Sequence, residues 1–244
     1  LNLGRPGLSG KRGANLALQN SDLIISIGSH LNSTISGTRP EFFARDARIV
    51  MVDIDSNELE HCPLGLEVAI NADASVFLDK LELHLSGMGI KQSSSDWIDY
   101  CQKYRSLNRI GLDYKDNRDR VNSYFLKTTL SSRSGPDDLF VVDGGGTVVY
   151  SALQSIEIKE RQRLFLSAGL CSMGSGIPEA IGVHYALPGQ RIFCMVGDGS
   201  FPFNMQDLQL IRDLGLPIKI VVFNNEGYVS IRTTQKDFLD GKEV

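Results

Sequence analysis

The sequence predicts an α/β protein with two doubly wound domains, each built on a mostly parallel sheet. Short apolar runs rich in Ile and Val recur along the chain, each ends in turn residues, and stretches with helical periodicity separate them. Buried parallel strands have this composition, and their alternation with helices is typical of a parallel sheet. A length of 244 residues is enough for two ordinary domains.

The first domain is expected over residues 1–85. Its predicted elements are strands at 22–28, 47–55 and 68–73 and a helix at 74–85. The stretch 86–96 is rich in Gly and Ser, which favours a linker, and 97–110 has the spacing of an amphipathic helix. We therefore expect 86–120 to be a linker and a helix that join two domains.

The second domain is expected over 121–244. Its predicted elements are strands at 139–143, 163–167, 191–196 and 218–223 and helices at 147–157, 176–187 and 204–214. In the last helix Asn204 is the expected N-cap and Asp207 its capping-box partner. Gly215 and Pro217 are expected to end that helix. Its expected apolar stripe consists of Met205, Leu208, Ile211 and Leu214.

Composition excludes several classes of function. The formal net charge of −4 favours neither nucleic acid nor an anionic membrane as a partner, and no apolar run approaches the length of a membrane span. The four cysteines are far apart, without the spacing of zinc ligands or of a disulfide framework, so we expect a reducing, cytoplasmic setting. Because the chain opens at Leu1 and stops at Val244 without a closing element, we expect a fragment of a longer protein.

One stretch places polar residues at the ends of two predicted strands. The sequence GDGS, residues 197–200, follows strand 191–196, and a pair of amides, Asn224 and Asn225, follows strand 218–223. A helix is expected between these strands, so they form a βαβ unit and run parallel. Their carboxyl ends therefore lie on the same edge of the sheet, which is where ligands bind in open α/β sheets.

The chemistry at this edge is that of hard oxygen ligands. Asp198 offers a carboxylate, Asn225 an amide oxygen and Gly227 a closely approachable carbonyl, and Mg²⁺ prefers such ligands and shares them with substrate phosphates. Gly199, Ser200 and the start of the next helix supply donors for a diphosphate. Ordinary turns contain the same residue types, since Gly, Asp and Asn favour turns for conformational reasons alone. The joint placement of the two motifs favours a site for Mg²⁺ and a diphosphate.

The GDGS turn followed by the Asn pair resembles the signature of thiamine diphosphate (ThDP) enzymes. Residues 167–200 resemble a segment of acetolactate synthase and its relatives, and residues 4–37 and 47–60 resemble their central domain. The resemblance implies a Rossmann-like central domain followed by most of the ThDP-binding fold. It also implies thiamine diphosphate and Mg²⁺ as cofactors.

The resemblance gives roles to individual residues. Asp198, Asn225 and Gly227 would hold Mg²⁺. Met173 matches the bulky residue that bends the cofactor, with core filler as the alternative, and the backbone carbonyl of Cys171 matches the one that binds the cofactor's 4′-amino group. These two are the expected catalytic residues, and the thiol of Cys171 is not expected to react. The expected cofactor-binding residues are Gly144, Gly145, Gly146, Met173, Gly174, Gly197, Asp198, Gly199, Ser200, Asn225, Gly227 and Tyr228.

The chain departs from acetolactate synthases at several positions. Residues 143–147 read DGGGT where those enzymes usually show a Gly-Gln-His loop, and Cys171 replaces a Gly. His30 stands where they carry an Arg that contacts FAD. Asp55, at a strand end, could take a ribose hydroxyl or cap a turn. FAD binding is therefore left open and is not favoured, and the particular reaction is left open as well.

The expected activity is ThDP- and Mg²⁺-dependent decarboxylation of a 2-keto acid such as pyruvate, with the thiazolium ring as electron sink, followed by addition to a second carbonyl. A sibling ThDP-dependent decarboxylase or specialised carboligase is the first alternative, and a non-catalytic nucleotide-binding module is the second. In the family a Glu on an N-terminal domain activates the cofactor, and active sites form between subunits. The resemblance thus implies a homodimer or tetramer and a fragment that is inactive alone. Substrate contacts are expected outside this chain or beyond Tyr228, where Gln235 is a candidate.

Overall fold

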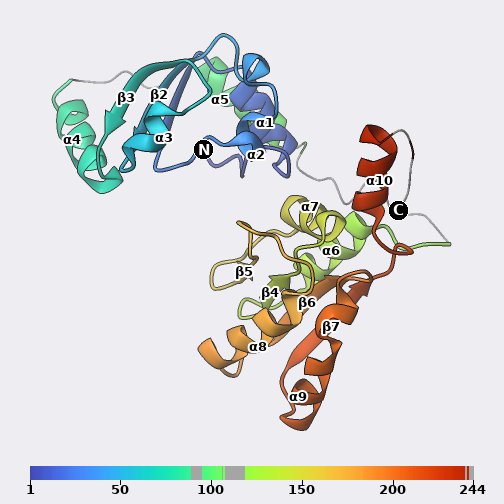
Figure 1. Ribbon diagram of the computed structural model, residues 1–244. Helices are drawn as coiled ribbons and strands as arrows, with labels where there is room; N and C mark the ends of the chain where they lie inside the picture. The colour runs from blue at the N-terminus through green and yellow to red at the C-terminus, as the bar shows by residue number, and fades with distance from the viewer. Residues whose placement is uncertain (89–94, 106, 108–118, 240, 242–244) are drawn as a thin grey trace. The chain divides into compact units, whose positions relative to one another are not determined.

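The computed structural model describes residues 1–88, 95–105, 107, 119–239 and 241. The chain divides into two compact units, Leu1–Asn108 and Arg109–Val244, and each is described by itself (Figure 1). Within the described ranges no helix has the length and apolar character needed to cross a membrane.

The first unit is a three-stranded parallel sheet with the strand order β1-β2-β3. Residues before and after each strand form short helices, and β2 is the central strand. The elements are α1 (Arg12–Gln19), β1 (Leu23–Ile27), α2 (Ser33–Ser36), η1 (Pro40–Phe42), β2 (Arg48–Asp53), α3 (Ser56–Glu60), β3 (Leu66–Asn71), α4 (Ala74–Ser86) and α5 (Ser95–Arg105). The three predicted strands and the helix predicted at 74–85 are confirmed to within two residues.

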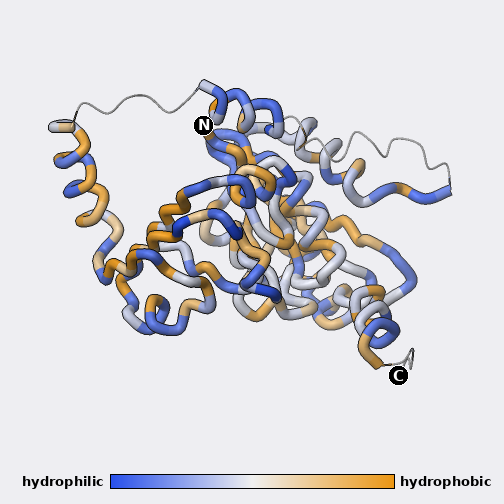
Figure 2. Tube along the Cα trace, turned by 90° about the horizontal axis from the view of Figure 1, so that it is seen from above, coloured by the Kyte–Doolittle hydropathy of each residue, from blue (hydrophilic) through white to orange (hydrophobic). Residues whose placement is uncertain are grey.

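The prediction that these strands are buried on both faces was wrong for the first unit. Ile25, Val50 and Val68 are in register across the sheet, and Ile25 and Val68 are 47% and 43% exposed. Met51, which points to the opposite face, is buried in the core cluster. Within the described residues, hydrophobic positions of α4 are exposed as well, and Figure 2 shows them in orange beside the grey trace. The pattern of an apolar run does not reveal whether other elements cover both faces of the sheet that the strand joins.

The second unit is a four-stranded parallel sheet with the strand order β5-β4-β6-β7. The chain runs from β4 outward to β5 and then returns to the other side of β4, so the order reverses between β4 and β6. The carboxyl ends at such a reversal form the ligand-binding crevice of doubly wound folds. The elements are α6 (Ser123–Arg133), β4 (Leu139–Val142), α7 (Gly146–Ser155), β5 (Arg163–Phe165), α8 (Gly176–Ala186), β6 (Ile192–Gly197), η4 (Phe201–Asp207), α9 (Leu208–Asp213), β7 (Ile218–Phe223) and α10 (Val229–Phe238).

The two central strands of this sheet are covered on both faces. Leu139 and Val141 of β4 face the cluster that α8 and α9 complete, whereas Phe140 and Val142 face the cluster that contains α7. All four residues of β4 are fully buried, as the sequence predicts for strands of this composition. The two helical layers fix the positions of β4 and β6, and the loops that follow start from the ends of these strands.

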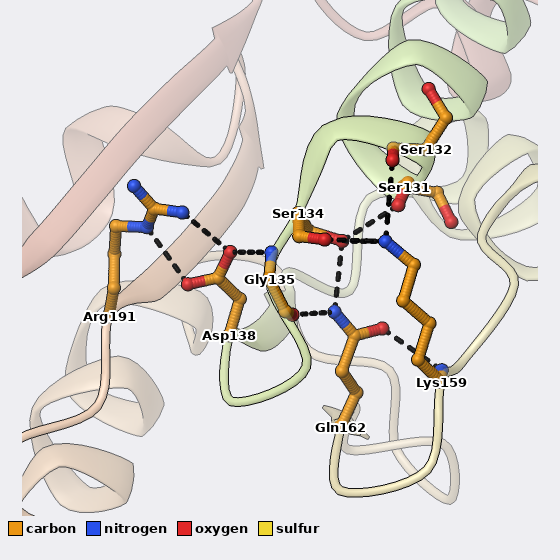
Figure 3. A network of polar contacts seen from close by, with 8 residues as sticks. All are labelled: Ser131, Ser132, Ser134, Gly135, Asp138, Lys159, Gln162 and Arg191. Carbon is orange, nitrogen blue, oxygen red and sulfur yellow. Dashed lines mark hydrogen bonds and ion pairs between the residues drawn. The ribbon is translucent and has the colours of Figure 1, made fainter.

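A polar network fixes the amino ends of β4 and β6 (Figure 3). The guanidinium of Arg191 donates two hydrogen bonds, of 2.9 and 2.6 Å, to the carboxylate of Asp138, which also accepts from the Gly135 N–H. Burial raises the pKa of Asp138, but the hydrogen bonds from Arg191 and Gly135 outweigh burial and hold that pKa below its usual value. The side chain of Gln162 donates to the Gly135 carbonyl and to Ser134. The network lies at the amino ends of these strands, so their carboxyl ends are available for a ligand-binding site.

The helix predicted at 204–214 is a different structure. Residues 201–207 form the 3-10 turn η4, and α9 covers only Leu208–Asp213. Asn204 does not cap a helix, because its side-chain amide donates instead to the Gly174 carbonyl at 2.7 Å and its backbone is not helical. Of the predicted apolar stripe, Leu208 and Ile211 pack on the core. Met205 and Leu214 are exposed.

The segment expected to be a linker and helix, 86–120, is described only in part. Residues 89–94, 106 and 108–118, including most of the end of the helix predicted at 97–110, lie outside the described residues. The described part of that helix is α5, which packs against α1 inside the first unit. The domain bounds 1–85, 86–120 and 121–244 stay predictions.

Candidate functional site

Asp198 and the end of β7 meet at the carboxyl edge of the second sheet. The Asp198 N–H donates to the Phe223 carbonyl at 3.2 Å, which joins the residue after β6 to the last residue of β7. The carboxylate of Asp198 accepts one hydrogen bond from the Gly199 N–H (3.0 Å) and one from the Gly227 N–H (2.7 Å). The two motifs are thus brought together, as parallel strands with their ends on one edge require.

The side chain of Asn225 is aimed by a neighbour from another element. Its amide nitrogen donates to the hydroxyl of Thr147, in the first turn of α7, at 3.2 Å. Its oxygen, Oδ1, is buried and has no hydrogen-bond partner among the described residues. A buried acceptor without a donor costs about 1–3 kcal/mol, so this oxygen is a ready ligand for a cation. Together with the nearby Asp198 carboxylate, it makes a donor set that fits Mg²⁺.

A small pocket of about 50 Å³ lies between the GDGS turn and the start of α7. Gly227 and Gly144 are near this pocket without being part of its lining, and Gly227 has a left-handed φ of 79°. The side chains of Tyr228 and Met173 flank Gly199, where a Cβ would lie 3.1 Å from the tyrosine ring and 3.5 Å from the methionine methyl. The lining includes Gly145, Gly146, Thr147, Met173, Gly197, Asp198, Gly199, Ser200, Asn225, Tyr228 and Ser230.

The glycine-rich turn after β4 allows close approach of other backbone segments. A Cβ at Gly144 would lie 2.2 Å from the carbonyl oxygen of Cys171, so only glycine fits there. The buried carboxylate of Asp143 accepts from the N–H groups of Gly145 (3.3 Å) and Gly176 (2.9 Å). Asp143 therefore ties the glycine turn to the start of α8. The turn leads directly into α7, and the N-terminus of a helix favours the binding of an anion.

The structure places the two expected catalytic residues differently. Met173 lines the pocket, where a wedge role is geometrically open to it. Cys171 has a positive φ of 52°, and its carbonyl packs against Gly144 outside the pocket lining. Burial raises the pKa of the Cys171 thiol, and the nearby carboxylates of Asp143 and Glu179 raise it further. A protonated thiol is a poor nucleophile, in agreement with the expectation that this thiol does not react.

The residues singled out in the first unit make local contacts. Asp55 is the N-cap of α3, and its carboxylate accepts from the Asn57 N–H at 2.9 Å. The imidazole of His30 pairs with the carboxylate of Glu58 beside a cavity of about 370 Å³. Among the described residues no group of three or more His, Cys, Asp or Glu side chains is arranged to hold a metal ion. Gln235 lies in α10, away from the pocket lining.

Sequence reasoning missed two contributors to the site. Thr147 was considered only as the end of a glycine-rich turn, although its hydroxyl orients Asn225. Lys127 of α6 was not considered, although its side chain is fully buried behind α7 and β7. Thr147 directly follows the glycine at which α7 begins, and a hydroxyl at that position is a weak sequence signal for a contact with the site. A single lysine in the sequence gives no signal of burial.

Two family models match this chain. Residues 144–244 match the thiamine pyrophosphate enzyme, C-terminal TPP binding domain, and residues 1–81 match the thiamine pyrophosphate enzyme, central domain. Thiamine pyrophosphate is another name for thiamine diphosphate. The chain belongs to the thiamine pyrophosphate enzymes and consists of parallel-sheet α/β domains of that family.

Within this family the chain is similar to acetolactate synthases. It is 32% identical over 243 residues to the acetolactate synthase large subunit of Corynebacterium glutamicum, covering 99% of this chain and 38% of that protein. It is 30% identical over 236 residues to the acetolactate synthase isozyme 2 large subunit of Escherichia coli, covering 97% and 41%. The large subunit of Porphyra purpurea is 31% identical over 239 residues, covering 97% and 39%. The chain spans about two fifths of the length of these relatives.

Proposed function

We propose that the whole protein is a ThDP- and Mg²⁺-dependent enzyme that decarboxylates a 2-keto acid of the pyruvate type and joins the product to a second carbonyl compound. The observation that carries the proposal is that Asp198 and Asn225, whose Oδ1 has no hydrogen-bond partner among the described residues, line one pocket at the carboxyl ends of β6 and β7. The family to which the chain belongs supports the cofactor. The names of its relatives support the reaction.

The residues of this chain have separable tasks in the proposal. Asp198, Asn225 and the carbonyl of Gly227 hold Mg²⁺. The diphosphate is held at the glycine turn, at Gly199 and Ser200, and at the N-terminus of α7. Met173 shapes the bound cofactor. When bound, the cofactor supplies an electron sink for the decarboxylation.

The oligomeric state and the cellular compartment of the enzyme are part of the same proposal. The pocket opens at the edge of one unit, so we propose that a second copy of the whole protein completes it in a homo-oligomer. All four cysteines are free thiols, which suits the reducing cytoplasm.

FAD is left out of the proposal, because His30 is already engaged by Glu58 and Asp55 caps α3. The substrate is a small 2-keto acid.

The test incubates the full-length protein with pyruvate, ThDP and Mg²⁺ and quantifies CO₂, acetolactate and acetaldehyde. Asp198→Ala is the variant expected to be inactive, and Asp213→Ala, at an exposed carboxylate that accepts from Gln209, is the matched control. Acetolactate that disappears in Asp198→Ala and persists in Asp213→Ala supports the carboligase. Acetaldehyde in its place identifies a sibling decarboxylase. Absence of both turnover and cofactor binding supports the non-catalytic module and overturns the proposal.

A further inference from the structure

Lys127 carries a buried amine without a carboxylate partner in the described part of the chain. It projects from α6, and its side chain has no exposed surface. Its ammonium donates to the hydroxyl of Ser123 (2.9 Å), to the carbonyl of Val148 (3.1 Å) and to the hydroxyl of Ser151. Burying an amine without an opposite charge is costly. A side chain of Met would fill similar space without that cost.

The amine of Lys127 makes its first contact with the site at the end of β7. The ammonium of Lys127 lies 3.9 Å from the centroid of the Phe223 ring, a cation–π contact. Phe223 is the last residue of β7, two positions before Asn225, and its carbonyl accepts from the Asp198 N–H. Lys127 therefore holds the residue that joins the two strand ends of the site.

The second contact goes to the first turn of α7. The hydroxyl of Ser151, which accepts from Lys127, donates to the carbonyl of Thr147 at 2.7 Å. The hydroxyl of Thr147 in turn accepts from the amide of Asn225. The ammonium also binds the carbonyl of Val148, whose side chain lines the pocket. One buried amine thus touches both elements between which Asn225 is held.

We propose that Lys127 is a positioning residue for the metal site. By holding the first turn of α7 against the end of β7, it keeps the hydroxyl of Thr147 where it turns the oxygen of Asn225 toward Mg²⁺. This inference rests on the proposed function, because the metal is part of that proposal. Partners that orient metal ligands in this way typically change metal affinity by about 10- to 100-fold when removed.

The experiment uses the full-length protein and measures the Mg²⁺ concentration that half-saturates ThDP binding, by equilibrium dialysis. The variants are Lys127→Met and Ser151→Ala. The matched control is Lys159→Met, because the amine of Lys159 also binds carbonyls of this unit, at Ser132 and Ser134 (Figure 3). Among the described residues, none of the hydrogen bonds of this amine goes to α7 or β7. The midpoint of thermal unfolding without ligands is measured for every protein.

The expected result is a rise of about tenfold or more in the half-saturating Mg²⁺ concentration for Lys127→Met, a rise in the same direction for Ser151→Ala, and a change of less than about twofold for Lys159→Met. A lower unfolding midpoint with unchanged Mg²⁺ dependence would overturn the inference and leave Lys127 as a packing residue. If Lys127→Met does not fold, Ser151→Ala decides: an unchanged value overturns the inference. Failure of the unmodified protein to bind ThDP with Mg²⁺ would instead overturn the proposed function.

Discussion

The side-chain amide of Asn225 donates a hydrogen bond to the hydroxyl of Thr147. In this arrangement the nitrogen is occupied, and Oδ1 is buried without a donor among the described residues. A cation that binds this oxygen would supply the partner that it lacks. The hydrogen bond connects the end of β7 with the first turn of α7. Substitutions at and around this contact therefore test the proposed metal site.

Replacement of Asn225 by Ala should weaken Mg²⁺ binding in the presence of ThDP by about 10- to 100-fold, since a ligand and its orientation are both lost. The free energy of unfolding without ligands should change by less than about 1 kcal/mol, because the substitution also removes an unsatisfied buried oxygen. Calorimetric titration with Mg²⁺ and denaturant unfolding measure the two quantities. Asn20→Ala, in the first unit, is the control, and equal Mg²⁺ affinity in the two variants would contradict the metal role.

Replacement of Gly144 by Ala should destabilise the protein by about 3 kcal/mol or more, because the new methyl group would lie 2.2 Å from the Cys171 carbonyl oxygen and backbone must move. Gly182, within α8, is the matched control, since apart from its chain neighbours and its own helix backbone no described atom lies within 4 Å of its added Cβ. Gly182→Ala should stabilise by about 0.5–1 kcal/mol through helix propensity. Denaturant unfolding of the two variants measures both effects. Similar stabilities would show that the 171–172 turn is not packed on Gly144.

The stability of the protein should depend on pH through Lys127. Burial lowers the pKa of Lys127 from 10.5 to about 7. Between these values the unfolded chain binds a proton at this amine and the folded protein does not, so the free energy of unfolding rises with pH, by at most about 1.4 kcal/mol per pH unit. Below pH 7 both states bind the proton and this dependence disappears.

Lys127→Met removes the titrating amine and serves as the reference for that measurement. The difference in free energy of unfolding between the unmodified protein and Lys127→Met should grow in favour of the unmodified protein from pH 7 to pH 10. Urea unfolding at a series of pH values gives this difference directly. Two curves that stay parallel over this range would show that the amine is as well solvated in the folded protein as in the unfolded chain.

The ion pair at the amino end of β4 should stabilise the protein at neutral pH. Asp138→Asn removes the charge that accepts two hydrogen bonds from Arg191, which should cost about 1–3 kcal/mol. Because the folded pKa of Asp138 is lowered, this stabilisation is present above the ordinary pKa of an Asp and is lost as the pH falls through the folded value. Unfolding at pH 7 and pH 3 measures it.

The neighbouring pair of Asp137 and Arg161 is the control for that prediction. Its two side chains are both largely exposed, and exposed pairs contribute little because water screens them. Asp137→Asn should therefore leave the unfolding midpoint almost unchanged at both pH values. An equal effect of the two substitutions would mean that the burial of Asp138 has no energetic consequence.

The parts of the fold that were predictable are those that depend on local patterns and general sheet rules. All seven predicted strands are present, because apolar runs bounded by turns are typical of buried strands. The approach of Asp198 to the end of β7 followed from the parallel arrangement of a βαβ unit. The candidate metal ligands could therefore be predicted, because they follow the ends of strands and the sequence predicts those ends well.

The parts that were not predictable depend on contacts between distant residues. Asn204 satisfies every local rule for a helix cap, but the Gly174 carbonyl, 30 residues away, takes its amide. The burial of Lys127 depends on the joint packing of α6, α7 and β7 and on no local pattern. The exposure of Ile25 depends on which elements cover the first sheet. In each case a tertiary contact overrode a local preference.

The most direct test of the central claim is a calorimetric titration of the full-length protein with ThDP, with and without Mg²⁺, for the unmodified protein, Asp198→Ala and Asp213→Ala. The account predicts that the unmodified protein and Asp213→Ala bind ThDP only when Mg²⁺ is present, and that Asp198→Ala loses this binding. Binding by Asp198→Ala with unchanged affinity and Mg²⁺ dependence would contradict the account, and so would the absence of binding by the unmodified protein.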